Sequence, residues 1–194
     1  MGSNSCRSLT FRVRMRAVRS AGGATFILAA LLLPAYISCG MPHPAPAEMP
    51  KPPADAQSLE SRTYRLVNDR RRAAGLSPLA HDARIAAVAR RHSEDMATGR
   101  VPTGHEGFEA RHRAISKTIP LSGIAENVGF NDYPLSETVR AAVSGWMGSR
   151  GHRENIEGRF DLTGVGIARD ARGAFYYTQI FVRRAGPARE HRSR

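Results

Sequence analysis

Apolar residues recur at helical spacing through the first half of the region from residue 58 to 183. The first segment predicts a helix that Gly75 ends, and its inner face is formed by Leu59, Thr63, Leu66, Val67 and Arg70. A second helix is expected between a cap at Asp82 and a stop at Gly99, with a face formed by Ile85, Val88, Ala89, His92 and Met96. A third short helix is predicted over residues 107–117.

The second half of the region mixes strands with a further helix. Residues 124–130 predict a strand, and Pro134 and Ser136 then open a helix. The inner face of that helix is formed by Val139, Ala142, Val143 and Trp146. Residues 163–168 and 175–181 alternate as strands do, on either side of a turn at 170–173, which is typical of a hairpin. Helices combined with an antiparallel hairpin indicate an α+β layered domain.

The helix that contains Trp146 runs into a glycine and a histidine. A glycine after the last periodic residue is a helix-stop signal, because glycine adopts the left-handed conformation there without strain. We therefore expect the chain to turn on Gly151 and to hold His152 just beyond a rigid helix end. Such a histidine is either a functional imidazole or a structural cap.

Residues 1–38 have the pattern of a secretory signal peptide. Five arginines and no acidic residue precede a short apolar run from Ala24 to Ile37, and small residues follow it. The run is shorter than the roughly 20 residues that a membrane span needs, although an uncleaved N-terminal anchor is the alternative. Met15 begins a more compact version of the same signal, so the start lies at Met1 or at Met15.

Cys39 is a candidate for lipidation. The segment from Ile37 to Gly40 resembles a bacterial lipobox, although Tyr36 departs from the aliphatic residue usual at its position. The alternative is an incidental cysteine downstream of an ordinary cleavage site. In either case the exported chain keeps one cysteine at most, so the fold must stand without an internal disulfide.

The remaining composition divides the exported chain into three parts. Residues 39–57 are rich in proline and predict a linker, residues 58–183 form the domain, and residues 184–194 form a basic disordered tail. The whole chain has 29 basic and 17 acidic residues, a net charge of +12, and loss of the five signal arginines leaves +7. No nucleic-acid motif accompanies this charge, so we expect no nucleic-acid partner. Membrane contact is expected only through the signal segment or a lipid anchor.

Short motifs of this chain together resemble one family. They occur in the order Leu66-Val67-Asn68-x-x-Arg71, Leu76-x-x-Leu79, His92-Ser93-x-Asp95-Met96, Gly104-His105, Ala125-Glu126-Asn127-Val128, Trp146-x-x-Ser149-x-Gly151-His152-Arg153-x-Asn155-Ile156, Thr163-Gly164-Val165-Gly166 and Tyr177-Thr178-Gln179-x-Phe181. This order resembles the bacterial branch of the CAP superfamily (cysteine-rich secretory, antigen-five and pathogenesis-related proteins), whose members are SCP-like extracellular domains. The resemblance covers residues 60–183.

The resemblance implies a three-layer α-β-α sandwich with a central, mostly antiparallel sheet. It also implies a surface cleft in which His105, Glu126 and His152 take the positions of the family's histidines and acid. Asn127 and Ser149 would line the same cleft. Ser149 stands where many eukaryotic members have a second glutamate, so the full set of two histidines and two glutamates is incomplete.

Two kinds of chemistry are open to this cleft. His105, Glu126 and His152 form a sensible ligand set for a divalent cation such as Zn²⁺ or Ca²⁺. In a hydrolase without a nucleophile, Glu126 would be the candidate general base toward a water molecule polarised by the histidines. Ser149 lacks the surroundings of an activated nucleophile, and we interpret it as a helix-end residue.

Other polar residues have simpler interpretations. His112 and Glu154 are expected to be surface charges, and His92 a core histidine. We therefore expect a secreted protein or envelope lipoprotein that binds a lipid, a peptide or cell-wall material through the cleft, and the residues assign it no definite enzymatic activity. The alternatives are a weakly metal-assisted, peptidase-like hydrolase that uses His105, Glu126 and His152, and a purely structural envelope protein.

Overall fold

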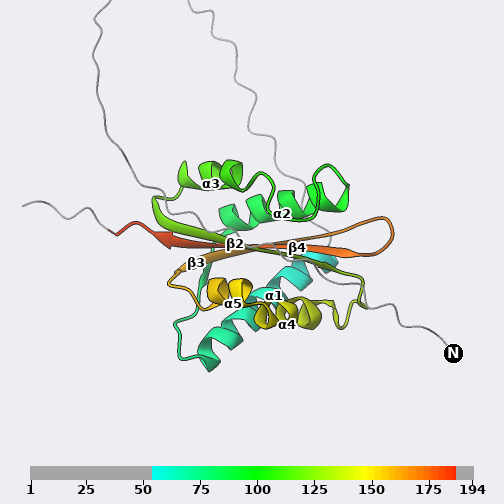
Figure 1. The fold of residues 1–194 in the computed structure, drawn as a ribbon, viewed down its shortest axis with the longest axis horizontal. Helices are drawn as coiled ribbons and strands as arrows, with labels where there is room; N and C mark the ends of the chain where they lie inside the picture. Colours follow the sequence, from blue (N-terminus) through cyan, green and yellow to red (C-terminus); the bar gives the residue numbers. More distant parts are fainter. Residues whose placement is uncertain (1–53, 187–194) are drawn as a thin grey trace, which may run out of the picture. The chain divides into compact units, whose positions relative to one another are not determined.

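The computed structural model describes residues 54–186, which form a sheet with helices on both faces (Figure 1). The elements in chain order are α1 (Ala54–Ala73), β1 (Ala80–His81), α2 (Ala83–Ala97), α3 (Phe108–Ser116), β2 (Leu121–Asn131), α4 (Thr138–Gly148), α5 (Arg150–Ile156), β3 (Leu162–Arg169) and β4 (Phe175–Arg184). The signal segment 1–38, Cys39, most of the expected linker and residues 187–194 lie outside the described residues. None of the helices between 54 and 186 has the length and apolarity that crossing a bilayer requires.

The four strands lie in the order β1-β3-β4-β2. β1 is parallel to β3, whereas β4 is antiparallel to both β3 and β2. The predicted hairpin is confirmed, and its turn is closed by a hydrogen bond from the Gly173 amide to the Asp170 carbonyl (3.0 Å). No strand was predicted at Ala80–His81, the residues of β1, because two residues are too few for an alternating pattern.

β3 is longer than its partner β1, so β1 pairs with only the start of its outer edge. Further along this edge, a side chain of α1 binds the backbone of β3. Glu60 of α1 accepts a hydrogen bond from the Ile167 amide (3.1 Å) and forms a bidentate pair with Arg90 of α2. The carboxylate therefore satisfies an edge amide that no strand reaches.

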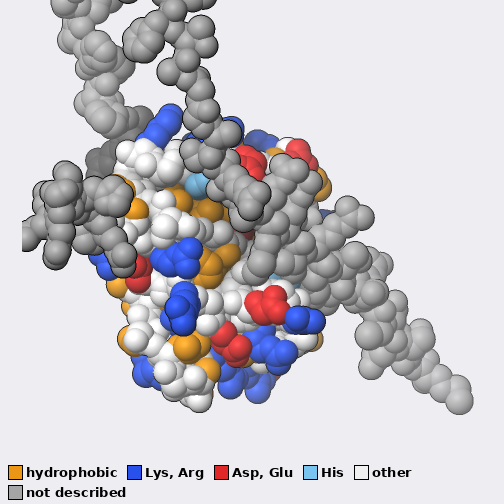
Figure 2. All heavy atoms as spheres, turned by 60° about the vertical axis from the view of Figure 1, so that its left-hand side comes forward, with side chains coloured by type: hydrophobic (Ala, Val, Ile, Leu, Met, Phe, Trp, Pro, Cys, Tyr) orange, Lys and Arg blue, Asp and Glu red, His pale blue; other side chains and the backbone are white. Residues whose placement is uncertain are grey.

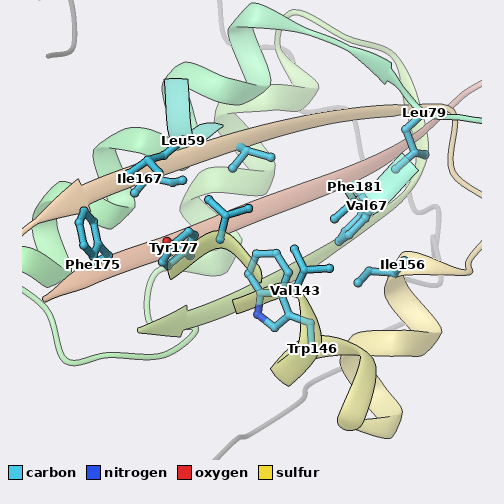
Figure 3. Close-up of a cluster of buried hydrophobic side chains, with 12 residues drawn as sticks. Leu59, Val67, Leu79, Val143, Trp146, Ile156, Ile167, Phe175, Tyr177 and Phe181 are labelled. Carbon is cyan, nitrogen blue, oxygen red and sulfur yellow. The ribbon is translucent and has the colours of Figure 1, made fainter. Parts of the chain in front are cut away.

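The helices divide into two layers around the sheet. Figure 1 shows α2 and α3 on one face and α1, α4 and α5 on the other. The larger core lies on the second face (Figure 3) and consists of Leu59, Val67, Leu79, Val139, Val143, Trp146, Ile156, Val165, Ile167, Phe175, Tyr177 and Phe181. The smaller core consists of Ile85, Ala89, Ile115, Ile119, Leu162, Ile180 and Val182. The predicted α-β-α sandwich with a mostly antiparallel sheet is thus confirmed.

Two glycines of β3 let α2 lie directly on the sheet. A Cβ atom on Gly164 would lie 2.1 Å from the amide nitrogen of Ala86, and one on Gly166 would lie 2.0 Å from that of Arg90. Both positions are far inside van der Waals contact with helix backbone, so no side chain fits there. The Thr-Gly-Val-Gly motif is therefore a requirement of helix–sheet packing.

The termini of the first two helices follow the sequence signals. The Asp82 carboxylate caps α2 by accepting from the amides of Arg84 and Ile85, and Gly75 and Gly99 both have positive φ after a helix end. α1 begins at Ala54, within the expected linker, and its buried face runs through Arg71 and not Arg70. Arg71 is buried because it donates to the Ile156 carbonyl (2.6 Å) at the end of α5.

The prediction that Gly151 stops the helix is wrong. α4 ends at Gly148, Ser149 is extended (φ −96°, ψ 122°), and α5 contains both Gly151 and His152. Ser149 donates its amide to the carbonyls of Gly145 and Trp146 and accepts from the Arg153 amide. One extended residue therefore joins the two helices, and no left-handed glycine is needed.

We expect Gly164→Ala to lower the free energy of unfolding by about 3 kcal/mol, because the added methyl group meets the backbone of α2. The matched control is Gly145→Ala in α4, where nothing lies within 4 Å of the added Cβ. This control should raise the stability by about 0.5–1 kcal/mol through helix propensity. Chemical denaturation of the three proteins measures both effects, and equal stabilities for Gly164→Ala and the parent would contradict the packing argument.

Candidate functional site

His105 lies in the loop between α2 and α3, and glycines on either side shape this loop. Gly104 has φ 152° and Gly107, which precedes α3, has φ 76°, both in the region that favours glycine. The His105 side chain is 21% exposed, so its ring lies at the surface while one edge faces the protein.

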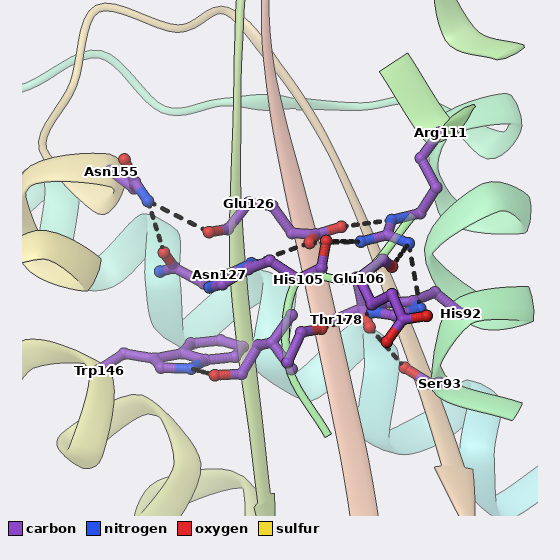
Figure 4. Close-up of polar contacts among 12 residues, drawn as sticks. His92, Ser93, His105, Glu106, Arg111, Glu126, Asn127, Trp146, Asn155 and Thr178 are labelled. Carbon is purple, nitrogen blue, oxygen red and sulfur yellow. Dashed lines mark hydrogen bonds and ion pairs between the residues drawn. The ribbon is translucent and has the colours of Figure 1, made fainter. Parts of the chain in front are cut away.

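Glu126 of β2 is the centre of the polar contacts (Figure 4). Its side chain is 1% exposed, and Arg111 of α3 binds it as a fork, from Nε to Oε2 at 2.6 Å and from Nη2 to Oε1 at 2.7 Å. His105 Nδ1 lies 3.0 Å from Oε1. Both oxygens of the carboxylate are therefore engaged by cationic or hydrogen-donating partners.

The remaining donors of Arg111 organise the loop that carries His105. Nη1 donates to the carbonyl of Glu106 (2.8 Å) and contacts Nδ1 of His92 (3.2 Å). His92 Nε2 lies 2.8 Å from the Gly104 carbonyl, which can only accept, so Nε2 carries the hydrogen and Nδ1 accepts from Arg111. His92 is thus the satisfied core histidine that the sequence predicted.

Burial and hydrogen bonding act in opposite directions on Glu126. Burial raises the pKa of its carboxyl, but the hydrogen bonds from His105 and Arg111 outweigh burial and hold that pKa below its ordinary value. Burial, followed by the charge of Arg111, lowers the pKa of His92. Glu126 is therefore an ionised carboxylate beside a neutral His92 at neutral pH.

His152 reaches the site from the other side of β2. It is a buried residue of α5, and its carbonyl accepts from Asn127 Nδ2 (3.1 Å). Asn155 Nδ2 donates to Asn127 Oδ1 (2.9 Å) and to the Glu126 carbonyl (3.2 Å). The two asparagines of the sequence motifs therefore tie α5 to β2 and position His152.

The free edge of β2 is covered by side chains. The Asn155 amide and Trp146 Nε1 donate to the carbonyls of Glu126 and Val128, the latter at 3.3 Å. Figure 4 shows Asn155 and Trp146 reaching β2 from one side while Arg111 and His92 lie on the other. The site therefore straddles the outermost strand and draws on both helical layers.

His152 is held neutral by its surroundings. Burial, and to a smaller extent the charge of His105, lower the pKa of His152 to about 4.

The predicted site residues are thus brought together in part. His105 contacts Glu126, and Asn127 contacts the backbone of His152, whereas Ser149 joins α4 to α5. Glu154 is exposed and pairs with Arg150 at 2.8 Å, as expected of a surface charge, whereas His112 is half-buried and lies 3.9 Å from Glu109.

Arg111 is the residue that the sequence analysis missed. A signal was present, because Arg111 lies between Phe108 and Ile115 on the inner side of α3 at helical spacing. A charged residue on such a face needs a buried partner of opposite charge.

The residues of this site do not fit a divalent metal. Both Glu126 oxygens are bound by Arg111 or His105, and the guanidinium places a positive charge beside the only carboxylate of the set. Within residues 54–186, no group of three or more His, Cys, Asp or Glu side chains is arranged to hold a metal ion.

Two further surface features lie in the described part of the chain. A shallow hollow of about 380 Å³ lies away from the histidines and is lined by Tyr64, Arg65, Asn68, Arg72, Pro78, Leu79 and Ala80. Figure 2 shows one face of the molecule, where Lys and Arg side chains are spread among acidic ones and form no dense basic patch. Neither feature places further chemistry beside Glu126.

Comparison with known proteins identifies the family. A sequence profile of the CAP family, the Cysteine-rich secretory protein family, matches residues 64–181. The chain therefore belongs to this family. The uncharacterized membrane protein YlbC of Bacillus subtilis (strain 168) is 32% identical over 129 residues, which are 64% of this chain and 34% of YlbC. The chain thus spans about a third of the length of that curated relative.

Solved structures of bacterial proteins share the fold. An extracellular protein of Bacillus anthracis that contains an SCP domain is 27% identical, with a TM-score of 0.56 over 71% of this chain and 45% of that protein. An outer surface protein of Borrelia burgdorferi is 16% identical, with a TM-score of 0.57 over 67% of this chain and 96% of that protein. A cysteine-rich secretory protein of Staphylococcus aureus is 23% identical, with a TM-score of 0.55 over 69% of this chain and 40% of that protein. At such low identities the last two show the fold alone.

We expect Arg111→Met to cost about 3–5 kcal/mol of stability, because it leaves the charge of Glu126 buried without its partner. The matched control is Arg150→Met, which breaks an exposed pair with Glu154 and should cost less than about 1 kcal/mol. Adding Glu126→Gln to Arg111→Met should restore part of the loss. Denaturant titrations of the parent and the three variants measure the free energies of unfolding. An equal loss of stability on substitution of Arg111 and of Arg150 would refute the importance of the buried pair.

We expect the stability of the fold to fall as the pH is lowered from about 6.5 to about 4. In this window the unfolded chain protonates His152, whose ordinary pKa is about 6.5, while the folded chain keeps it neutral. The stabilisation is complete above pH 6.5, and its loss amounts to about 3 kcal/mol at most. His152→Gln should flatten the profile in a denaturation series from pH 7 to pH 4.5. Profiles of equal slope would show that His152 is not held neutral.

Proposed function

We propose that this chain is a non-enzymatic binding domain that acts outside the cytoplasm and recognises a cell-envelope ligand rich in hydroxyl and amide groups through the surface around His105. The hydrogen bond between His105 and Glu126 carries this proposal. Because the carboxylate accepts the hydrogen on Nδ1, the ring is held in one orientation, with Nε2 on its opposite edge and on a partly exposed side chain. An imidazole nitrogen oriented in this way can form a hydrogen bond with a sugar hydroxyl or a peptide group.

The charge balance of the site favours a polar ligand without a strong net charge. Arg111 neutralises Glu126, and His92 and His152 are both neutral at physiological pH. The residues around His105 are polar, which supports a glycan or peptide over the hydrocarbon chain of a lipid. Peptidoglycan offers both hydroxyl and amide groups, and we propose it as the ligand.

The state of Glu126 argues against catalysis. A general base needs a free oxygen near the reacting water and a pKa near the working pH. Here both oxygens are engaged, and hydrogen bonds keep the pKa below its ordinary value. A hydrolase that used Glu126 would first have to release Arg111.

The location outside the cytoplasm rests on two observations. Residues 1–38 have the composition of an export signal. The relatives from Bacillus anthracis, Borrelia burgdorferi and Staphylococcus aureus are extracellular, outer-surface and secretory proteins by name. Lipidation of Cys39 would tether the domain to the envelope, and its absence would release it.

We expect the full chain to sediment with purified peptidoglycan sacculi, and His105→Ala to reduce the bound fraction at least tenfold. The control is His112→Ala, a histidine at the surface of α3 that makes no contact with Glu126. Circular dichroism checks that both variants remain folded.

Equal retention of the parent and His105→Ala would contradict binding through this surface. Soluble fragments released from the sacculi by the parent, but not by Glu126→Gln, would support the hydrolase alternative. Mass spectrometry of the supernatant detects such fragments.

A further inference from the structure

The guanidinium of Arg111 is enclosed by groups that bind cations. The acceptors around it are both Glu126 oxygens at 2.6 and 2.7 Å, the Glu106 carbonyl at 2.8 Å and the His92 imidazole nitrogen at 3.2 Å. The His105 carbonyl lies at the limit of hydrogen bonding, 3.5 Å from Nη2. Oxygen and imidazole acceptors that converge on one positive charge are also the donors that proteins offer to divalent cations.

Two of the acceptors, Glu126 and His92, are held in place independently of Arg111. Glu126 lies in the middle of β2, which pairs with β4 along its length, and His92 lies in α2 against the sheet. The His92 ring is fixed by the Gly104 carbonyl, which keeps the lone pair of Nδ1 directed at the guanidinium. Removal of the Arg111 side chain would therefore leave the Glu126 carboxylate and the His92 nitrogen in position, with the Glu106 carbonyl beside them in the loop.

We infer that Arg111 is the built-in cation of this site, and that it excludes a divalent metal by filling a latent cation-binding cage formed by Glu126, His92 and the carbonyl of Glu106. The cage requires a positive charge because Glu126 is 1% exposed and ionised, and a buried carboxylate must be paired. Arg111 fills it whether or not a ligand binds beside His105.

Zinc binding tests this inference through a gain of function. Isothermal titration calorimetry with Zn²⁺ is carried out on the full chain without a purification tag, on Arg111→Ala and on Arg111→Ala/Glu126→Gln. The expected result is that Arg111→Ala binds one zinc ion at least tenfold more tightly than the parent, and that the second substitution abolishes this gain. Zinc binding at other positions of the chain occurs in all three proteins, so it does not affect the difference in zinc affinity between them.

Arg111→Ala is expected to be destabilised, so a second measurement keeps the test decisive. A ligand that binds only the folded state raises its melting temperature by mass action. Zinc or methylguanidinium, each at low millimolar concentration, should raise the melting temperature of Arg111→Ala but not of the parent. Methylurea, which has a similar shape and no charge, is the matched control and should have no effect. Arg111→Lys keeps a positive charge in the cage and should gain no zinc binding.

Two results would overturn the inference. The first is saturable zinc binding by the parent that Glu126→Gln removes, because a metal and Arg111 would then share the carboxylate. The second is an Arg111→Ala protein that neither binds zinc nor responds to either cation, whether it is folded or unfolded. Both results leave the peptidoglycan experiment on His105 unaffected.

Discussion

The ion pair between Arg111 and Glu126 joins parts of the fold that are distant in the sequence. Glu126 belongs to the outermost strand, Arg111 to the short helix α3, and the same guanidinium holds the loop that carries His105. α3 has few other anchors, since Ile115 is its one fully buried residue in the described structure. The position of His105 therefore depends on this buried charge pair together with the hydrogen bond between His92 and the Gly104 carbonyl. The carboxylate at the centre of the site has its charge balanced by Arg111.

Most of the fold follows from signals that are local in the sequence. The Asp82 cap, the glycines after α1 and α2, and the alternation on both sides of the Asp170–Gly173 turn fix elements without knowledge of the rest of the chain. The arrangement of the helices and the sheet in three layers was predicted from the family motifs. The spacing of apolar residues predicts single elements and does not predict how they pack together. The β1 strand escapes prediction because its two residues are defined only by pairing with β3.

The contacts of Glu126 contain chemistry that motif position does not. Motif position predicted His105, Glu126 and His152 as a cleft site and gave Glu126 the role of metal ligand or general base, because the partner on α3 was overlooked. A carboxylate with both oxygens engaged neither binds a metal nor accepts a proton readily, so one missed arginine changes the function inferred. The error at Gly151 has a similar origin, since the extended backbone of Ser149 made the turn that glycine was expected to make.

The side chains that meet the two margins of the sheet have a consequence for association between molecules. Asn155 and Trp146 occupy carbonyls along β2, and Glu60 takes an amide on the far side of β3. The unpaired backbone groups of an edge strand can pair with a strand of another molecule. Here side chains occupy some of these groups at both edges of the sheet. Detachment of α5 would withdraw Asn155 from the Glu126 carbonyl, while Trp146 of α4 would still cover the Val128 carbonyl. The edge of β2 is therefore protected by two helices, and both must move before another strand can add along its length.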